Sequence, residues 1–136
     1  METMEEKSER VKATDSLVKV YIKKGQLGNA LKAAELGASP QGIDFLVEAC
    51  IKERTLGNAL KAAKLGASPQ GIDSLVEACV KEGWFIVAQE AAKLGRRKLS
   101  TQEIDSLVEV YIKEGKLSYA LKAAKLGASP QGIDSL

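Results

Sequence analysis

The sequence predicts an all-α protein, built as a right-handed α-solenoid of about four stacked helix-turn-helix repeats. Units that begin with aspartate recur along the chain, and their first residues (Asp15, Asp44, Asp73 and Asp105) are 29, 29 and 32 positions apart. Within each unit the apolar residues follow the period of an amphipathic helix, and no run alternates with the period of two that is typical of a strand. With 45% hydrophobic and 28% charged residues, the 136-residue chain carries enough apolar surface to fold.

The charged segment 1–14 precedes the first unit, and we expect it to extend the first helix as a polar cap. The repeats that follow are predicted to occupy residues 15–43, 44–72, 73–104 and 105–133, with the start of a fifth at 134–136. Segments 27–44 and 56–73 differ only at Glu35 against Lys64. Such a close match indicates either recent duplication or deliberate consensus building, and both stay open.

Each unit is predicted to hold two helices, of about 13 and about 10 residues. Ser39-Pro40 predicts the start of the first, because serine accepts bonds from free N–H groups and proline lacks a donor that the first turn does not need. Its apolar stripe is Ile43, Leu46, Val47, Cys50 and Ile51. The second helix is expected to begin at about Leu56 and to end at Gly66, a left-handed C-terminal cap. Helices this short need stacking for their stability.

The third unit departs from this pattern. Ile86 and Val87 stand where other units have Gly28-Asn29 or Gly57-Asn58, and the chain's one tryptophan lies beside them. Apolar side chains on an outer helix face are typical of an interface. We therefore take as candidate partner-binding residues Trp84, Ile86, Val87 and Tyr119.

The third unit also carries a three-residue insertion within segment 96–103. Its basic cluster is Arg96, Arg97 and Lys98, which we expect to form a solvated loop rather than a phosphate site. An alternative to the exposed interface is that the insertion folds back, so that Leu99 covers Ile86 or Trp84.

Polar side chains of the first helices form ladders opposite the apolar stripe. The ladder residues are Asp15, Asp44, Asp73 and Asp105, then Glu48, Glu77 and Glu109, then Lys52, Lys81 and Lys113. Each Glu is four residues before a Lys, so i,i+4 ion pairs are expected. The ladders have two interpretations, a solvated surface that compensates its own charge and a groove that faces a ligand.

Composition argues against catalysis. The chain has no histidine, no nucleophile with a paired base, no phosphate-binding glycine loop and no metal-ligand motif, so neither an enzyme nor a cofactor is predicted. Cys50 and Cys79 occupy equivalent repeat positions and are expected to be buried, unbonded small apolar residues. The N-terminus lacks the apolar core of a secretory signal, and no stretch approaches the roughly 20 apolar residues of a membrane span, so we expect a cytoplasmic protein.

The phrase Tyr-Ile-Lys-x-Gly-x-Leu-x-x-Ala-Leu, at residues 21–31 and 111–121, resembles the helix-turn-helix of tetratricopeptide and especially pentatricopeptide repeats. Those units have about 34 residues, so this would be a short 29-residue variant. The Leu-Gly-Ala-Ser turn also resembles the ankyrin repeat, although its Thr-Pro-Leu-His signature is absent. The first resemblance implies that the first helices line a concave side.

Pentatricopeptide proteins bind single-stranded RNA, and this resemblance implies that the four repeat-starting aspartates occupy the base-reading position. Carboxylates there repel phosphodiesters, and a net charge of +2 offers little compensation. We therefore expect a non-catalytic scaffold that binds protein or peptide and self-associates, with no membrane partner. The alternatives are a single-stranded RNA-binding array and an engineered consensus repeat without a biological ligand.

Self-association is expected through an array end or through the third repeat. The chain stops at residues 133–136, a fifth unit barely begun, which would leave the apolar stripe of the last helix partly uncovered: Leu117, Ala120, Leu121 and Ala124. Either a longer chain or another subunit is expected to cover them.

Overall fold

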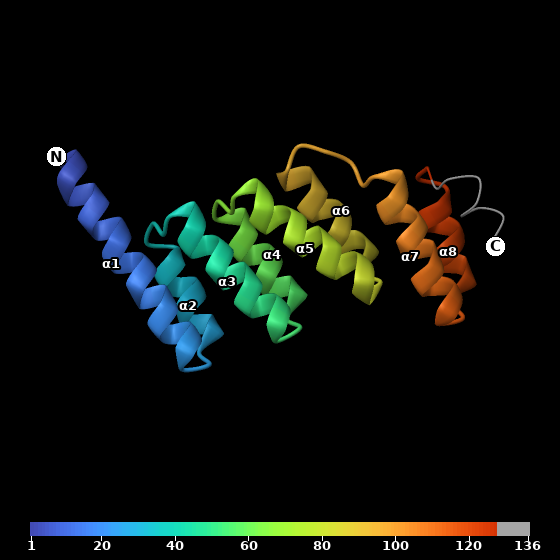
Figure 1. Ribbon diagram of the computed structural model, residues 1–136, viewed down its shortest axis with the longest axis horizontal. Helices are drawn as coiled ribbons and strands as arrows, with labels where there is room; N and C mark the ends of the chain where they lie inside the picture. Colours follow the sequence, from blue (N-terminus) through green and yellow to red (C-terminus); the bar gives the residue numbers. More distant parts are fainter. Residues whose placement is uncertain (128–136) are drawn as a thin grey trace. The chain divides into compact units, whose positions relative to one another are not determined.

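The computed structural model describes residues 1–127, which form eight α-helices and no strand (Figure 1). The helices are α1 (Met4–Lys23), α2 (Leu27–Ala34), α3 (Pro40–Lys52), α4 (Leu56–Lys64), α5 (Pro69–Glu82), α6 (Phe85–Leu94), α7 (Thr101–Lys113) and α8 (Leu117–Ala124). The predicted all-α class is therefore confirmed for this part of the chain. The predicted start of a fifth repeat, at 134–136, lies outside the described residues.

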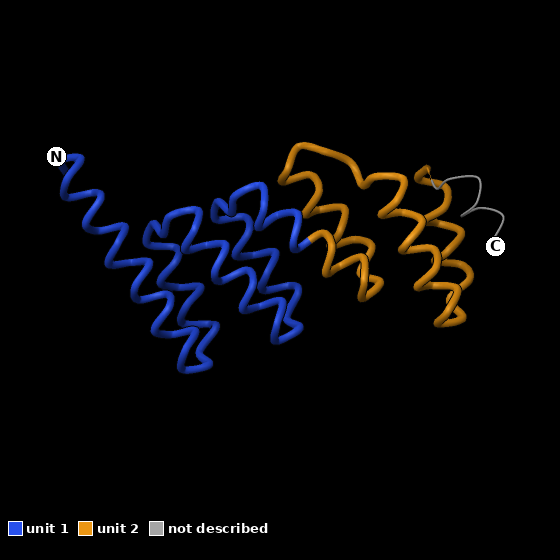
Figure 2. The backbone as a smooth tube through the Cα atoms, in the orientation of Figure 1, with its two compact units in different colours: residues 1–75 blue, residues 76–136 orange. Residues whose placement is uncertain are grey.

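The chain divides into two compact units, residues 1–75 and 76–136 (Figure 2). In the first unit α1 packs against α2 and α3 against α4, and α3 also contacts both α1 and α2. In the second unit α7 packs against α8. These three helix pairs match the pairing that the sequence repeat predicts.

The helix starts follow the predicted capping chemistry. The Ser39 hydroxyl accepts a hydrogen bond from the Gly42 amide at 3.1 Å, and Pro40 occupies the first turn of α3. Ser100 caps α7 in the same way, and its own amide donates a hydrogen bond to the Glu103 carboxylate. Segment 1–14 was predicted to extend the first helix, and α1 begins within it at Met4 and continues without interruption to Lys23.

Turns between paired helices need a left-handed residue. Gly25, Gly83 and Gly115 hold this place with φ of 73°, 74° and 72°. Arg54 holds the equivalent place between α3 and α4 with φ of 59°. Because a Cβ makes this conformation costly, the turn at Arg54 is strained where the other three are relaxed.

Most of the core consists of branched side chains from the odd-numbered helices and alanines from the even-numbered ones, and α4 adds Leu56 and Leu60. Leu46, Leu75 and Leu107 are fully buried, and so are Ala30, Ala59, Ala88 and Ala120, which share one repeat position. Small side chains let helices approach closely. The two cysteines are free and fully buried, as predicted, and burial raises the pKa of the Cys79 thiol to about 12.

Aspartates join successive helix pairs of the first unit. The Asp15 carboxylate accepts hydrogen bonds from the Ser39 amide at 2.8 Å and from the Ser39 hydroxyl at 2.5 Å. Asp44 accepts the same two bonds from Ser68, the amide bond being 2.8 Å long. Each carboxylate thus holds the serine that caps the following odd-numbered helix, and we call this arrangement the Asp–Ser clasp.

Candidate partner-binding groove

An open hollow of about 490 Å³ lies in the second unit, beside the turn that joins α5 to α6. We call it the aromatic groove, and its lining residues are Gly83, Trp84, Phe85, Ile86, Val87, Tyr111, Tyr119 and Lys122. The whole chain has one Trp, three Tyr and two Phe, of which the Trp, two Tyr and one Phe line this groove. Aromatic residues are therefore concentrated at one place on the protein.

The turn before α6 projects the tryptophan. Gly83 is left-handed, and the Trp84 amide then donates to the Cys79 carbonyl at 2.8 Å, which closes the end of α5. Trp84 is the N-terminal flanking residue of α6, and its side chain makes no capping bond. Its indole is consequently left at the groove, where 46% of the residue is exposed.

Tyr111 of α7 forms the floor of the groove. It is buried, and its hydroxyl donates to the Gly83 carbonyl at 2.6 Å. Burial raises the pKa of the Tyr111 phenol. The Tyr111 ring also stacks on the Tyr119 ring of α8, with centroids 5.6 Å apart and planes 29° apart. Tyr111 therefore links the α5–α6 turn to α8.

The exposed side chains around the aromatic groove are uncharged, with the exception of Lys122. Ile86 is 68% exposed and Tyr119 is 53% exposed. The ammonium of Lys122, the one charged residue of the lining, lies 5.6 Å from the centre of the Tyr119 ring. The groove is chemically suited to an apolar or aromatic anchor with a negative charge beside it.

The structure places all four predicted partner-binding residues, Trp84, Ile86, Val87 and Tyr119, around this groove. Sequence reasoning missed Phe85, Tyr111 and Lys122. No sequence signal distinguished Tyr111, because the first repeat carries a tyrosine, Tyr21, at the same position.

The alternative in which Leu99 covers Ile86 or Trp84 is wrong. Leu99 is buried, but it lines a separate pocket together with Ile104 and Leu126, and Ile86 stays exposed. The insertion therefore packs its leucine elsewhere and leaves the rim of the aromatic groove open.

The predicted polar ladders have mixed surroundings. Asp15 and Asp44 are half-buried in Asp–Ser clasps, so their carboxylates are already bonded within the protein. Asp73 is exposed and Asp105 half-buried. The glutamates and lysines of the ladders, Glu48, Glu77, Glu109, Lys52, Lys81 and Lys113, are all exposed. Of the three Glu–Lys pairs, only Glu77–Lys81 closes within residues 1–127, at 3.5 Å with both side chains mostly exposed.

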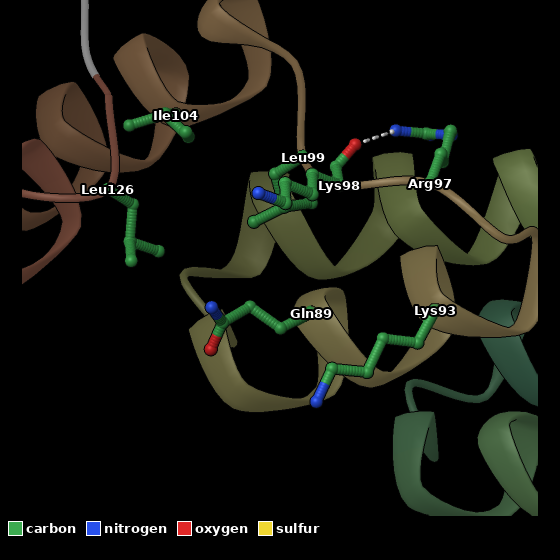
Figure 3. A pocket seen from close by; sticks show the side chains of 7 residues that line it. All are labelled: Gln89, Lys93, Arg97, Lys98, Leu99, Ile104 and Leu126. Carbon is green, nitrogen blue, oxygen red and sulfur yellow. Dashed lines mark hydrogen bonds between the residues drawn. The ribbon is translucent and has the colours of Figure 1, made fainter.

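The basic cluster does not act as one group. Arg96 is exposed and left-handed, with φ of 57°. Arg97 bonds to both carboxylate oxygens of Glu103, at 2.8 and 3.1 Å, and holds the pKa of Glu103 below its usual range. Lys98 lines the pocket that also contains Leu99 (Figure 3).

In the part of the chain that the structure describes, no three Cys, Asp or Glu side chains are grouped to hold a metal ion, and no helix combines the length and the apolar composition of a membrane span. Comparison of the chain with protein-family models, curated proteins and solved structures gives no match. The resemblance to tetratricopeptide and pentatricopeptide repeats therefore stays a prediction.

Proposed function

We propose that this protein is a non-catalytic helical-repeat scaffold that binds a segment of another protein in the aromatic groove. The observation that carries the proposal is the concentration of aromatic side chains at that groove, with Trp84, Ile86 and Tyr119 about half exposed or more. Tryptophan and tyrosine dominate the energetic centres of protein interfaces, because they bury much apolar area at little cost in side-chain entropy.

The floor of the groove is held in place before any partner binds. Tyr111 is fixed by its bond to the Gly83 carbonyl and by its stacking on Tyr119. A site that is already ordered loses little conformational entropy on association. The exposed side chains above it supply the contact area.

The lining also indicates the chemistry of the partner. Within residues 1–127, Lys122 is the one charged residue of the lining and no carboxylate lines the groove. An amphipathic segment with an aromatic or aliphatic anchor and an Asp or Glu nearby would bury its anchor against Trp84 and Ile86 and pair its carboxylate with Lys122.

The test is selection of a random peptide display library against the intact protein, followed by measurement of the affinity of the enriched peptides. We expect enrichment of an aromatic or large aliphatic residue close to Asp or Glu. Enrichment of basic peptides without an apolar anchor would contradict the proposal.

Another repeat of the chain supplies the substitutions that test the groove. Ile86→Gly combined with Val87→Asn installs the residues that α4 carries at Gly57 and Asn58, so the helix keeps a sequence that this repeat already tolerates. We expect this variant to unfold cooperatively and to lose at least tenfold in peptide affinity, which is about 1.4 kcal/mol. Equal affinity for the variant would show that the peptides bind elsewhere.

Single-stranded RNA binding receives less support. Two of the aspartates that the resemblance places at base-reading positions, Asp15 and Asp44, accept bonds from serines of this chain. A titration with single-stranded RNA at low and moderate salt tests the alternative, because phosphate contacts give an affinity that falls steeply with salt.

A second candidate function is self-association through α8, with a second copy of the chain as the occupant. Leu117 and Leu121 are 60% and 50% exposed, whereas Leu56 and Leu60, at the same repeat positions in α4, are 2% and 7% exposed. The same side chains are thus covered in one helix and open in the other. Sedimentation of the intact chain should show a mass above 14.5 kDa that Leu121→Glu returns to the monomer. A monomer at high concentration would reject self-association and leave the groove proposal untouched.

A further inference from the structure

A second pocket, of about 260 Å³, lies in the second unit beside the loop that joins α6 to α7 (Figure 3). Its walls are formed mainly by Gln89, Lys93, Lys98, Leu99, Ile104 and Leu126. It shares no lining residue with the aromatic groove. A ligand of this pocket would therefore touch none of the residues that line the aromatic groove.

Two features of this pocket occur only in the third repeat. Gln89 replaces a leucine that the other repeats carry at Leu31, Leu60 and Leu121. Lys98 and Leu99 belong to the insertion, which the other repeats lack. The pocket thus coincides with both the polar substitution in α6 and the extra loop residues.

The loop is braced rather than loose. The Arg97 guanidinium bonds to the Glu103 carboxylate at 2.8 and 3.1 Å and donates a further bond to the Lys98 carbonyl at 3.1 Å, which is drawn in Figure 3. The Glu103 carboxylate also accepts from the Ser100 amide at 2.8 Å. Leu99 is buried between these anchors. Because the wall is already ordered, a ligand would have little conformational entropy to overcome.

The pocket has an apolar side and a cationic side. Leu99 and Ile104 are buried and Leu126 is 47% exposed, and together they give an aliphatic surface. In Figure 3 the Gln89 amide and the Lys98 ammonium both extend toward the side on which Leu126 lies. Within residues 1–127, Lys93 and Lys98 form no ion pair, so both ammonium groups remain available to a ligand.

We propose that this pocket binds a small carboxylate that carries an aliphatic body. The carboxylate would pair with Lys98 and accept a hydrogen bond from the Gln89 amide, while the aliphatic part would lie against Leu99 and Ile104. A free phosphate would leave the aliphatic surface unused, and a neutral aliphatic molecule would leave the lysines unpaired. A volume of about 260 Å³ suits a ligand smaller than the drug-sized molecules that fill larger protein pockets.

Two sources supply this chemistry, a short-chain fatty acid and the C-terminal residue of a peptide. Titration of the intact protein with hexanoate and with N-acetyl-leucine, followed by amide chemical shifts, distinguishes them. We expect saturable shifts of the Gln89 side-chain amide and of the Lys98 and Leu99 backbone amides, with a Kd on the order of 1 mM for a ligand of this size. Saturation by either acid supports the site, and the tighter acid identifies the source.

The controls separate charge from apolar contact. Hexanamide and N-acetyl-leucine amide keep the aliphatic body without the carboxylate, and inorganic phosphate keeps the charge without the body. All three should bind at least about tenfold more weakly than the acids. Equal binding of an acid and its amide would overturn the proposal, as would the absence of saturable shifts from both acids at concentrations about tenfold above the expected Kd.

Two substitutions test the residues assigned to the site. Lys98→Gln removes the charge from an exposed side chain, and Gln89→Leu restores the residue of the other three repeats. Each should weaken hexanoate binding about tenfold without changing the midpoint of thermal unfolding. Lys32→Gln, which removes an exposed lysine from α2, should have no effect. An equal loss from Lys32→Gln and Lys98→Gln would show that the acid responds only to overall charge and would overturn the site.

Discussion

The carboxylate of Asp15 lies against Gly42, so that a Cβ added to this glycine would overlap with the Asp15 Oδ1 atom and lie 2.8 Å from its carboxyl carbon. The same relationship joins Asp44 to Gly71. Both glycines stand in the first turn of a helix, where alanine would otherwise be preferred. The glycine of the Ser-Pro-Gln-Gly phrase thus makes room for the Asp–Ser clasp.

We predict that Gly42→Ala destabilises the protein by about 1–2 kcal/mol, because the added methyl group displaces the Asp15 carboxylate from Ser39. Gly28→Ala is the matched control, since this glycine also lies in a helix and an added Cβ would meet nothing within 4 Å. It should stabilise the protein by about 0.5–1 kcal/mol through helix propensity alone. Urea unfolding measures both. Stabilisation by both substitutions would reject the steric role of Gly42.

The contributions of Asp15 and Ser39 to the free energy of unfolding should be coupled. Asp15→Ala removes the acceptor of both hydrogen bonds, whereas Ser39→Ala removes only the bond from the hydroxyl, together with the cap on the Gly42 amide. We expect each to cost about 2 kcal/mol and the double substitution to cost less than the sum by about 1 kcal/mol or more. A double-mutant cycle by urea unfolding measures this difference. Strict additivity would mean that the two residues act independently.

Arg54 offers a stabilising substitution. It holds a left-handed conformation, with φ of 59°, at the turn position where three other helix pairs have glycine. Arg54→Gly should therefore raise the free energy of unfolding by about 1 kcal/mol. The reciprocal change Gly25→Arg, at an open site with φ of 73°, should lower it by a similar amount. Thermal unfolding of the two variants should shift in opposite directions, and a shared direction would contradict the assignment of strain.

The sequence predicted the helices well because their boundaries depend on local chemistry. The Ser-Pro start of α3 and the end of α4 before Gly66 follow from capping groups that lie within a few residues of one another. The clasp could not be predicted in the same way, because it joins Asp15 to Ser39 across 24 residues. An aspartate that faces solvent and one that bonds to the next helix occupy the same position in the sequence repeat. The sequence pattern therefore does not distinguish them.

The groove was predicted in part for a similar reason. Ile86 and Val87 were recognisable because they break a repeat that has Gly and Asn at these positions. Tyr111 follows the repeat pattern at Tyr21, so nothing in the sequence set it apart, and only tertiary packing brings its hydroxyl to the Gly83 carbonyl. The placement of Leu99 was open for the same reason, since the packing of an inserted loop depends on the surface it meets.

Acid should weaken the second unit through Glu103. Arg97 and Ser100 bond to its carboxylate and lower its pKa in the folded protein below the usual value of about 4.3. A lowered pKa contributes stability that is fully present above the unfolded-state pKa and is lost as the pH falls through the folded-state pKa. Glu103→Gln should therefore be less stable than the parent at pH 7 and should lose less stability between pH 5 and 3. Parallel stability curves for the two proteins over this range would contradict the role of Glu103.

Tyr111 should stabilise the second unit through one hydroxyl group. Tyr111→Phe keeps the ring that stacks on Tyr119 but removes the 2.6 Å bond to the Gly83 carbonyl, which leaves that carbonyl without this donor. We expect a loss of about 1–2 kcal/mol, measured by urea unfolding at pH 7. Because burial raises the pKa of the Tyr111 phenol in the folded state, its contribution is present below the unfolded-state pKa of about 10 and is lost as the pH rises through the folded-state value. The cost of Tyr111→Phe should therefore shrink in alkali, and Tyr21→Phe, in the equivalent position of the first repeat, controls for loss of a tyrosine elsewhere. A constant cost from pH 7 to pH 11 would show that the hydroxyl is not what links the turn to α7.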